Sequence, residues 1–406
     1  ALLVLALAAS NVFAEITFSG EVSGTWTVVD GEGGKKVNPP PAAGAAVPPF
    51  VDASTKLGHG FGSDANLKVV AANEEKTWGG QFNIKKKPEF ADVLVWWQPI
   101  KYVKATYGMI DTWRPFTIHE DVFTGIKVVD SSGGVGLQIY PLDALEIAFG
   151  LPVTGTYAKD KPILPSQEIK NNYSVFSAYA AYSLSGIADF GLGFKGGSNK
   201  DDLQETVYKD GVTYSELNLG VAVTAIENVT LQLGVFFYLP QTFNVHNAPV
   251  GVAPPAIAYE ITGQKPLKIH LKAGYTLDAF DIGALIKVGF GGSTTKKTPA
   301  PGSTETKTEN GFSFSIKLTP SYKLNIGKFG ADLTFGLTGA STTGGTSDYD
   351  DTVTFAAKPY FEKAYGGGTL NVAFDMALTN YTNDEHQKDD YGHFQWSVPI
   401  KLKYAF

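Results

Sequence analysis

The chain has 406 residues, no Cys and a formal net charge of −7. The lack of Cys excludes disulfide scaffolds, cysteine zinc sites and cysteine nucleophiles, and the acidic balance gives no support to nucleic-acid binding, which needs a basic face. The 45 Gly and 22 Pro argue against a helical protein, and the 13% aromatic residues argue against a disordered one.

The first residues are typical of the end of a secretory signal peptide. An apolar run over 1–9 is followed by Val12-Phe13-Ala14, which places small or aliphatic residues at positions −3 and −1 of a cleavage site. We therefore expect 1–14 to be a truncated signal peptide and 15–406 to form a single domain. A short buried strand or helix is the alternative interpretation of the apolar run.

From Glu15 onward, apolar and polar residues alternate with a period of two. The alternation is clearest over 145–153, 229–239, 312–326, 370–379 and 393–406. Successive side chains of a strand point to opposite faces, so each segment is predicted to be a strand with one apolar and one polar face.

The predicted strands are joined alternately by short turns and by long polar connections. The short turns are expected at 73–76, 99–102, 141–144, 185–188, 226–228, 277–279, 326–328 and 365–368. The long connections are expected at 30–63, 111–130, 154–172, 199–211, 240–264, 292–310, 341–350 and 382–392, with a weaker one at 85–90. This pattern predicts about 18 antiparallel strands, or 16 if the pair around 85–90 is merged.

These features together predict an all-β fold, a transmembrane antiparallel β-barrel with short periplasmic turns and long extracellular loops. A soluble sandwich buries its apolar face against a second sheet, whereas outer-membrane barrels sort their connections into short and long sets. No stretch reaches 18 consecutive apolar residues, which a transmembrane helix would need. Lipid offers no hydrogen bonds, so the sheet is expected to close on itself.

The faces predicted to point inward carry charged residues. The candidate pore-lining residues are Lys268, His270, Lys272, Lys287, Lys317, Lys323, Lys401, Lys403, Asp281, Asp332 and Asp375. The first five fall on three consecutive predicted strands and form a basic wall, with Asp281 as its main acid. A wall of one sign attracts counter-ions, so a mild anion preference is expected. The alternative is that inward charges balance over the whole barrel.

The last strand carries a family resemblance. Phe406 is preceded at outward positions by Tyr404, Leu402 and Ile400, a pattern that resembles the C-terminal assembly signal of outer-membrane barrels. With its paired strands, the chain resembles an outer-membrane porin of a diderm bacterium. The resemblance implies passive diffusion of small hydrophilic solutes and ions through the bacterial outer membrane. It implies lipid, the barrel assembly machinery and these solutes as partners, a homotrimer as the assembly, and no cofactor.

The resemblance also singles out the third long connection, because the third outer loop of porins folds into the barrel and narrows it. The candidate constriction residues are Asp111, Arg114, Glu120 and Asp121. Arg114 is the single Arg among 33 basic residues, a departure from porins, whose constrictions resemble an arginine ladder. The alternative is an ordinary surface loop with one salt bridge.

Other functions remain open at this stage. The long connections 30–63 and 240–264 are large enough for a surface adhesin. Inward aromatic residues could instead form the binding track of a substrate-specific channel; they are Trp96, Tyr140, Tyr179, Phe236 and Tyr238. The six His show no zinc-site spacing, so we expect neither a metal site nor an enzyme.

Overall fold

The computed structural model describes residues 15–37, 50–52, 56–85, 90–115, 117–128, 134–152, 176–196, 215–239, 242–247, 257–300, 303–343, 351–382 and 391–406. The predicted signal peptide, 1–14, lies outside these residues. Within the described ranges, no helix is long and apolar enough to cross a membrane.

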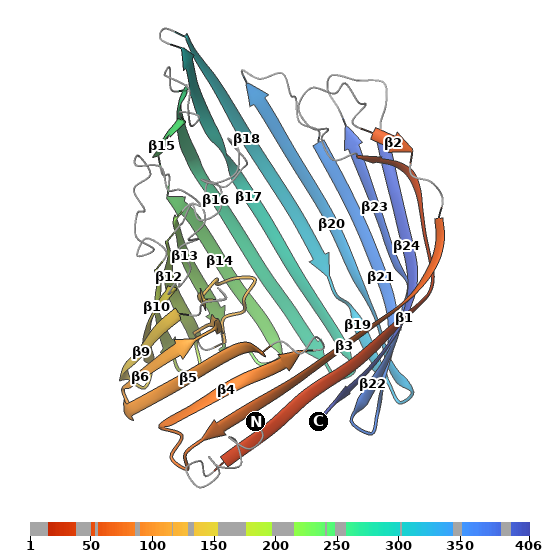
Figure 1. Ribbon diagram of the computed structural model, residues 1–406. Helices are drawn as coiled ribbons and strands as arrows, with labels where there is room; N and C mark the ends of the chain where they lie inside the picture. Colours follow the sequence, from red (N-terminus) through yellow and green to blue (C-terminus); the bar gives the residue numbers. More distant parts are fainter. Residues whose placement is uncertain are drawn as a thin grey trace.

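A closed antiparallel β-barrel contains almost all of the described residues (Figure 1). The elements are β1 (Glu15–Val37), β2 (Phe50–Asp52), β3 (Lys56–Ala72), β4 (Trp78–Lys85), β5 (Phe90–Ile100), β6 (Val103–Gly108), β7 (Ile110–Trp113), β8 (Ile126–Val128), β9 (Gly134–Leu142), β10 (Leu145–Pro152), β11 (Ser177–Leu184), β12 (Ala188–Lys195), β13 (Ser215–Val223), β14 (Val229–Leu239), β15 (Thr242–Asn247), β16 (Ile257–Leu277), β17 (Phe280–Ala300), β18 (Ser303–Leu318), β19 (Ser321–Leu324), β20 (Gly327–Thr343), β21 (Asp351–Tyr365), β22 (Gly368–Ala373), β23 (Asp375–Thr382) and β24 (Tyr391–Ala405).

The barrel wall has 18 strands, which confirms the larger of the two predicted numbers. All elements except β7 and β8 belong to one 22-stranded sheet. In that sheet β2 is a short addition to the end of β1. Three wall strands are each made of two elements that pair with the same neighbour: β14 with β15, β18 with β19, and β22 with β23.

The barrel closes where its first strand pairs with its last. β1 pairs with β3 on one side and with β24 on the other, with Val22 opposite Tyr404. At the end of this seam, the Phe406 N–H donates to the Gly20 carbonyl at 3.0 Å, and the Gly20 N–H donates to the Phe406 carbonyl at 2.9 Å. The seam therefore leaves no open edge, as a strand in lipid requires. The role of Phe406 and Tyr404 as an assembly signal stays a prediction.

The predicted short turns are also confirmed. All eight fall between neighbouring antiparallel strands, at 73–77, 101–102, 143–144, 185–187, 224–228, 278–279, 325–326 and 366–367. Asn228 and Asp278 adopt positive φ angles of 62° and 49°, a conformation that Asn and Asp tolerate better than most residues.

Three of the predicted long connections differ from the structure, because strands continue into them. The predicted connections 154–172 and 199–211 lie outside the described residues. β17 and β18 stay paired as far as Ala300 and Ser303, so that most of 292–310 is strand. β1 and β16 extend in the same way into 30–63 and 240–264. The residues of 292–310 are rich in Thr and Lys. Thr favours strands, but a strand that is polar on both faces lacks the alternation on which the prediction depended.

The outer face of the barrel is apolar and exposed. Aromatic residues near the strand ends are 44–60% exposed, and these are Trp97, Tyr182, Tyr275, Tyr322 and Tyr404. Neighbouring positions alternate sharply: on β12, Asp189 is 3% exposed and Phe190 is 43% exposed. Such an apolar exterior would be unstable in water and matches the lipid-facing band of a transmembrane barrel.

Candidate functional site

A loop inside the barrel forms the best-defined site of the molecule. β7 and β8 pair with each other in a small sheet of their own. The segment between them, 114–125, is called here the inward loop (Figure 1). It contacts the polar faces of β12, β13, β14, β16 and β17, which point into the lumen.

The apolar side of the inward loop packs onto the wall. Ile118, Val122 and Phe123 are 0–2% exposed. The residues that pack with them are Ile110, Ile126, Ala148, Tyr179, Ala181 and Ala222, with Trp113 at the margin. This cluster is the main buried core of the described chain, so the lumen is filled on this side by close packing.

Glycines make this close approach possible. Gly191, Gly193 and Gly220 lie directly under the Phe123 ring, and a Cβ at these positions would lie 2.7–2.9 Å from ring atoms. Gly234 of β14 lies similarly close to the Val122 backbone. Any larger residue at these positions would push the loop away from the wall.

Polar side chains of β12 and β14 hold the start of the inward loop. The Thr117 hydroxyl donates to the Asp189 carboxylate. The His119 N–H donates to Gln232 Oε1 at 2.9 Å, and Gln232 Nε2 donates back to the Thr117 carbonyl at 3.2 Å. The loop backbone is thereby satisfied inside the lumen, as buried polar groups require.

β13 holds the end of the loop. The Thr124 N–H donates to Asn218 Oδ1 at 3.1 Å, and its hydroxyl donates to Glu216 Oε1 at 2.7 Å. Asn218 also donates to the Val235 carbonyl of the next strand at 3.2 Å. Asn218 and Gln232 were not singled out from the sequence. Each of these two polar residues points inward and lies two positions before an inward glycine, and this spacing in the sequence could have identified them.

Ionic contacts connect the loop to β16 and β17. Lys287 donates to Asp121 Oδ1 at 2.8 Å, and His270 Nδ1 donates to the Asp121 carbonyl at 2.5 Å. Within the loop, Arg114 pairs with Glu120 at 3.3 Å. The loop thus carries the candidate constriction residues Arg114, Glu120 and Asp121 into the lumen. The Asp111 side chain lies outside the described residues.

Two loop residues have shifted pKa values. Burial lowers the pKa of His119, assisted by the charge of Lys272, so the ring is neutral at neutral pH. This agrees with the Asp121 N–H donating to His119 Nδ1 at 3.2 Å. Burial would raise the pKa of Asp121, but the hydrogen bond from Lys287 and the charges of Lys287, His119 and Lys272 lower it below its ordinary value.

The predicted basic wall is partly neutralised. Lys287 pairs with Asp121, and Lys317 pairs with Asp332 at 3.1 Å. The acids beside these lysines are therefore not the predicted Asp281, which lies next to a short turn, opposite Ser321. The reason is that Asp121 reaches the wall from a loop far away in the sequence.

The remaining predicted pore-lining residues lie elsewhere on the wall. Lys403 pairs with Glu21 at 2.5 Å, and Asp375 pairs with Lys358 at 3.0 Å. Lys272 lies close enough to Asp121 and Glu120 to interact with their charges. Lys268, Lys323 and Lys401 are exposed.

The predicted aromatic track is largely covered. Tyr179 is 3% exposed and Phe236 is 5% exposed, because Tyr179 packs against Phe123 and Phe236 packs against His270. Neither ring can stack against a passing solute. Trp96 and Tyr140 are half-buried, and the Tyr238 side chain lies outside the described residues.

Among the described residues, no group of three or more His, Cys, Asp or Glu side chains is arranged to hold a metal ion.

The closed barrel, its apolar exterior and its charged lumen define a class of protein. They are the features of a transmembrane β-barrel of the bacterial outer membrane, as predicted. No protein-family model matches the chain, and no curated protein matches it.

Solved structures similar to the chain are outer-membrane barrels. A loop-deletion mutant of OmpT, an outer-membrane protein of Vibrio cholerae, is 12% identical with a TM-score of 0.42, over 97% of this chain and 99% of that chain. An anion-selective porin from Comamonas acidovorans is also 12% identical with a TM-score of 0.42, over 97% of this chain and 99% of that chain. OccK11 of Pseudomonas aeruginosa is 8% identical with a TM-score of 0.48, over 97% of each chain.

Proposed function

We propose that the protein is a passive diffusion channel for small hydrophilic solutes and ions, narrowed by the inward loop. A barrel of this strand number encloses a lumen wide enough for an aqueous channel. The observation that carries the proposal is the contrast between the two sides of the lumen. The loop covers β12 to β14 and buries inward residues such as Asp189, Asn218 and Phe236, whereas charged residues on the other side stay open to water.

On the open side of the lumen, ion pairs connect β18 with β20 and β24 with β1. The side chains of Lys317 and Asp332 are 44% and 35% exposed, and those of Lys403 and Glu21 are 42% and 40% exposed. Exposed pairs of this kind add little stability. They provide a hydrated, charged surface along which polar solutes can pass.

A weak anion preference is part of the proposal. Where the inward loop meets β16 and β17, the described residues place three cations against two carboxylates. The cations are Arg114, Lys272 and Lys287, and the carboxylates are Glu120 and Asp121. An excess of positive charge beside a narrow passage raises the local concentration of anions.

Liposome swelling tests the channel. Vesicles containing the purified protein should swell in iso-osmotic sugar solutions, at rates that fall as the sugar becomes larger and rise linearly with sugar concentration. Vesicles with heat-denatured protein provide the control. A lumen filled by packed side chains would give no swelling, and a saturating rate would favour the substrate-specific channel.

The proposal also includes the way in which the protein acts and assembles. Transport is passive, so the proposal assigns no catalytic step. A homotrimer is the assembly expected from the family resemblance, and its mass in detergent can be measured directly. The adhesin alternative depends on the connections 30–63 and 240–264, parts of which lie outside the described residues.

A further inference from the structure

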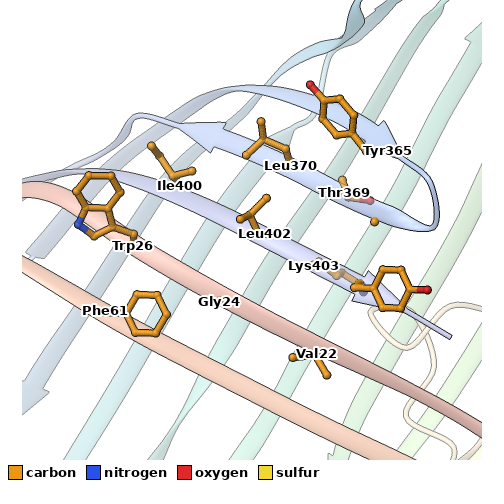
Figure 2. Close-up of a pocket in the computed structure, with 12 residues that line it drawn as sticks. Val22, Gly24, Trp26, Phe61, Tyr365, Thr369, Leu370, Ile400, Leu402 and Lys403 are labelled. Atoms are coloured by element: carbon orange, nitrogen blue, oxygen red, sulfur yellow. The ribbon is translucent and has the colours of Figure 1, made fainter.

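The outer surface of the barrel has an apolar groove across the closing seam. Figure 2 shows it, lined by residues of β1, β3, β21, β22 and β24, with a volume of about 840 Å³. This is within the size range of small-molecule pockets, roughly 300–1,000 Å³. We propose that this groove is a binding site for one anionic phospholipid, with an acyl chain in the groove and the phosphate at Lys363.

The groove exists because Gly24 has no side chain. Leu370, Leu402 and Gly24 lie in one row across three neighbouring strands. Gly24 contributes no side chain to this row, whereas in the next row Trp26 lies opposite Phe61. These two rings form one end of the groove (Figure 2).

The other end of the groove lies beside a short turn and is polar. Tyr365 and Tyr404 are 53% and 51% exposed there. Exposed tyrosines of a transmembrane barrel lie at the level of the lipid headgroups, with the ring in the apolar region and the hydroxyl in the polar one. The groove therefore runs from the headgroup level of the periplasmic leaflet toward the hydrocarbon.

A cation lies at this polar end. Lys363 is opposite Leu370, and directly paired residues share one face of a sheet, so Lys363 is on the outer face. Its Nζ lies 5.0 Å from the centre of the Tyr365 ring. Among the described residues, no carboxylate pairs with it. A lipid phosphate would neutralise this cation, which is why a phospholipid fits the groove better than an apolar face of a second copy.

The experiment is native mass spectrometry of the full-length protein in detergent, titrated with palmitoyl-oleoyl phosphatidylglycerol. The wild type should retain one lipid per chain. Lys363→Gln should weaken binding about fivefold, the contribution of roughly one cation at a lipid surface. Gly24→Leu should abolish retention, because its side chain would fill the groove. A Cβ at Gly24 meets its nearest atom, in the Phe61 ring, at 3.4 Å, so the variant can still fold.

Lys101→Gln is the matched control. Lys101 also lies over a tyrosine at a short turn, with its Nζ 4.6 Å from the centre of the Tyr102 ring, but it is away from the groove. Lipid binding should be unchanged in this variant. Equal loss in Lys101→Gln and Lys363→Gln, or full retention in Gly24→Leu, would overturn the proposal. A lower oligomer mass in Gly24→Leu with unchanged lipid binding would also overturn it, since the groove would then be a contact between copies.

Discussion

Lys287 of β17 and Asp121 of the inward loop are 166 positions apart in the sequence and form a 2.8 Å hydrogen-bonded ion pair inside the barrel. Their side chains are 38% and 30% exposed. Hydrogen bonds to side chains of β12 to β14 hold the two ends of the loop, whereas this ion pair holds its middle. The pair is therefore the contact whose loss should change the passage most selectively.

Lys287→Met should loosen the middle of the loop. A partly exposed pair contributes at most about 1 kcal/mol, so the fraction of time that this part of the loop is detached should rise about fivefold. Single-channel recordings should show larger fluctuations of the open-channel current. Lys317→Met is the control, because it breaks a pair between two wall strands. Equal fluctuations in both variants would show that the loop is not held by Lys287.

Mild acid should leave the loop attached. The pKa of Asp121 lies below its ordinary value of 3.8 because of Lys287 and other nearby charges. The contribution of the pair is therefore complete above pH 3.8 and is lost as the pH falls through the lowered pKa. Current fluctuations should stay constant from neutral pH down to 3.8 and rise only below it. Asp121→Asn should lack this acid-induced rise, and a rise well above pH 3.8 in the wild type would contradict the assignment.

Phe123→Ala should widen the passage. Phe123 is 0% exposed and fills the space above Gly191, Gly193 and Gly220. Replacing a buried Phe by Ala typically costs about 3–5 kcal/mol, more than the loop can lose without moving from the wall. Swelling rates for the larger sugars should rise relative to the smallest one. Phe335→Ala, at a 39% exposed position on the outer face, should leave the size dependence unchanged.

Lys272→Gln should reduce the preference for anions. Lys272 interacts with the charges of both Asp121 and Glu120, so its loss reduces the excess of positive charge beside the loop. The reversal potential in a salt gradient should shift toward cation selectivity. Lys323→Gln, beside a short turn at the barrel end, is the control. A cation-selective wild type, or equal shifts in both variants, would contradict the proposed origin of selectivity.

Much of the barrel could be predicted from the sequence, because the membrane imposes a simple pattern. Apolar exposure on one face makes the period of two visible, and a turn such as 278–279 interrupts it for only two residues. The extended ends of β17 and β18 were not predicted, since strands outside the lipid need no apolar face. The 18-strand number followed from counting the turns.

The site could be predicted only in part. A family resemblance pointed to the connection that contains Arg114, Glu120 and Asp121. Periodicity shows which face of a strand a residue occupies, but it does not show what crosses the lumen to meet that face. The pairing of Asp121 with Lys287 and the packing of Phe123 on inward glycines depend on the closed shape of the barrel. For the same reason, the predicted aromatic track did not reveal that the loop covers Tyr179 and Phe236.

We propose an open, water-filled barrel that is narrowed but not closed by its inward loop. The most direct test is the current carried by single molecules of the wild-type protein in a planar lipid bilayer at several salt concentrations. We expect discrete current steps whose size is linear in voltage and grows with salt concentration. Insertion of the folded protein without any current above that of the bare bilayer would contradict it.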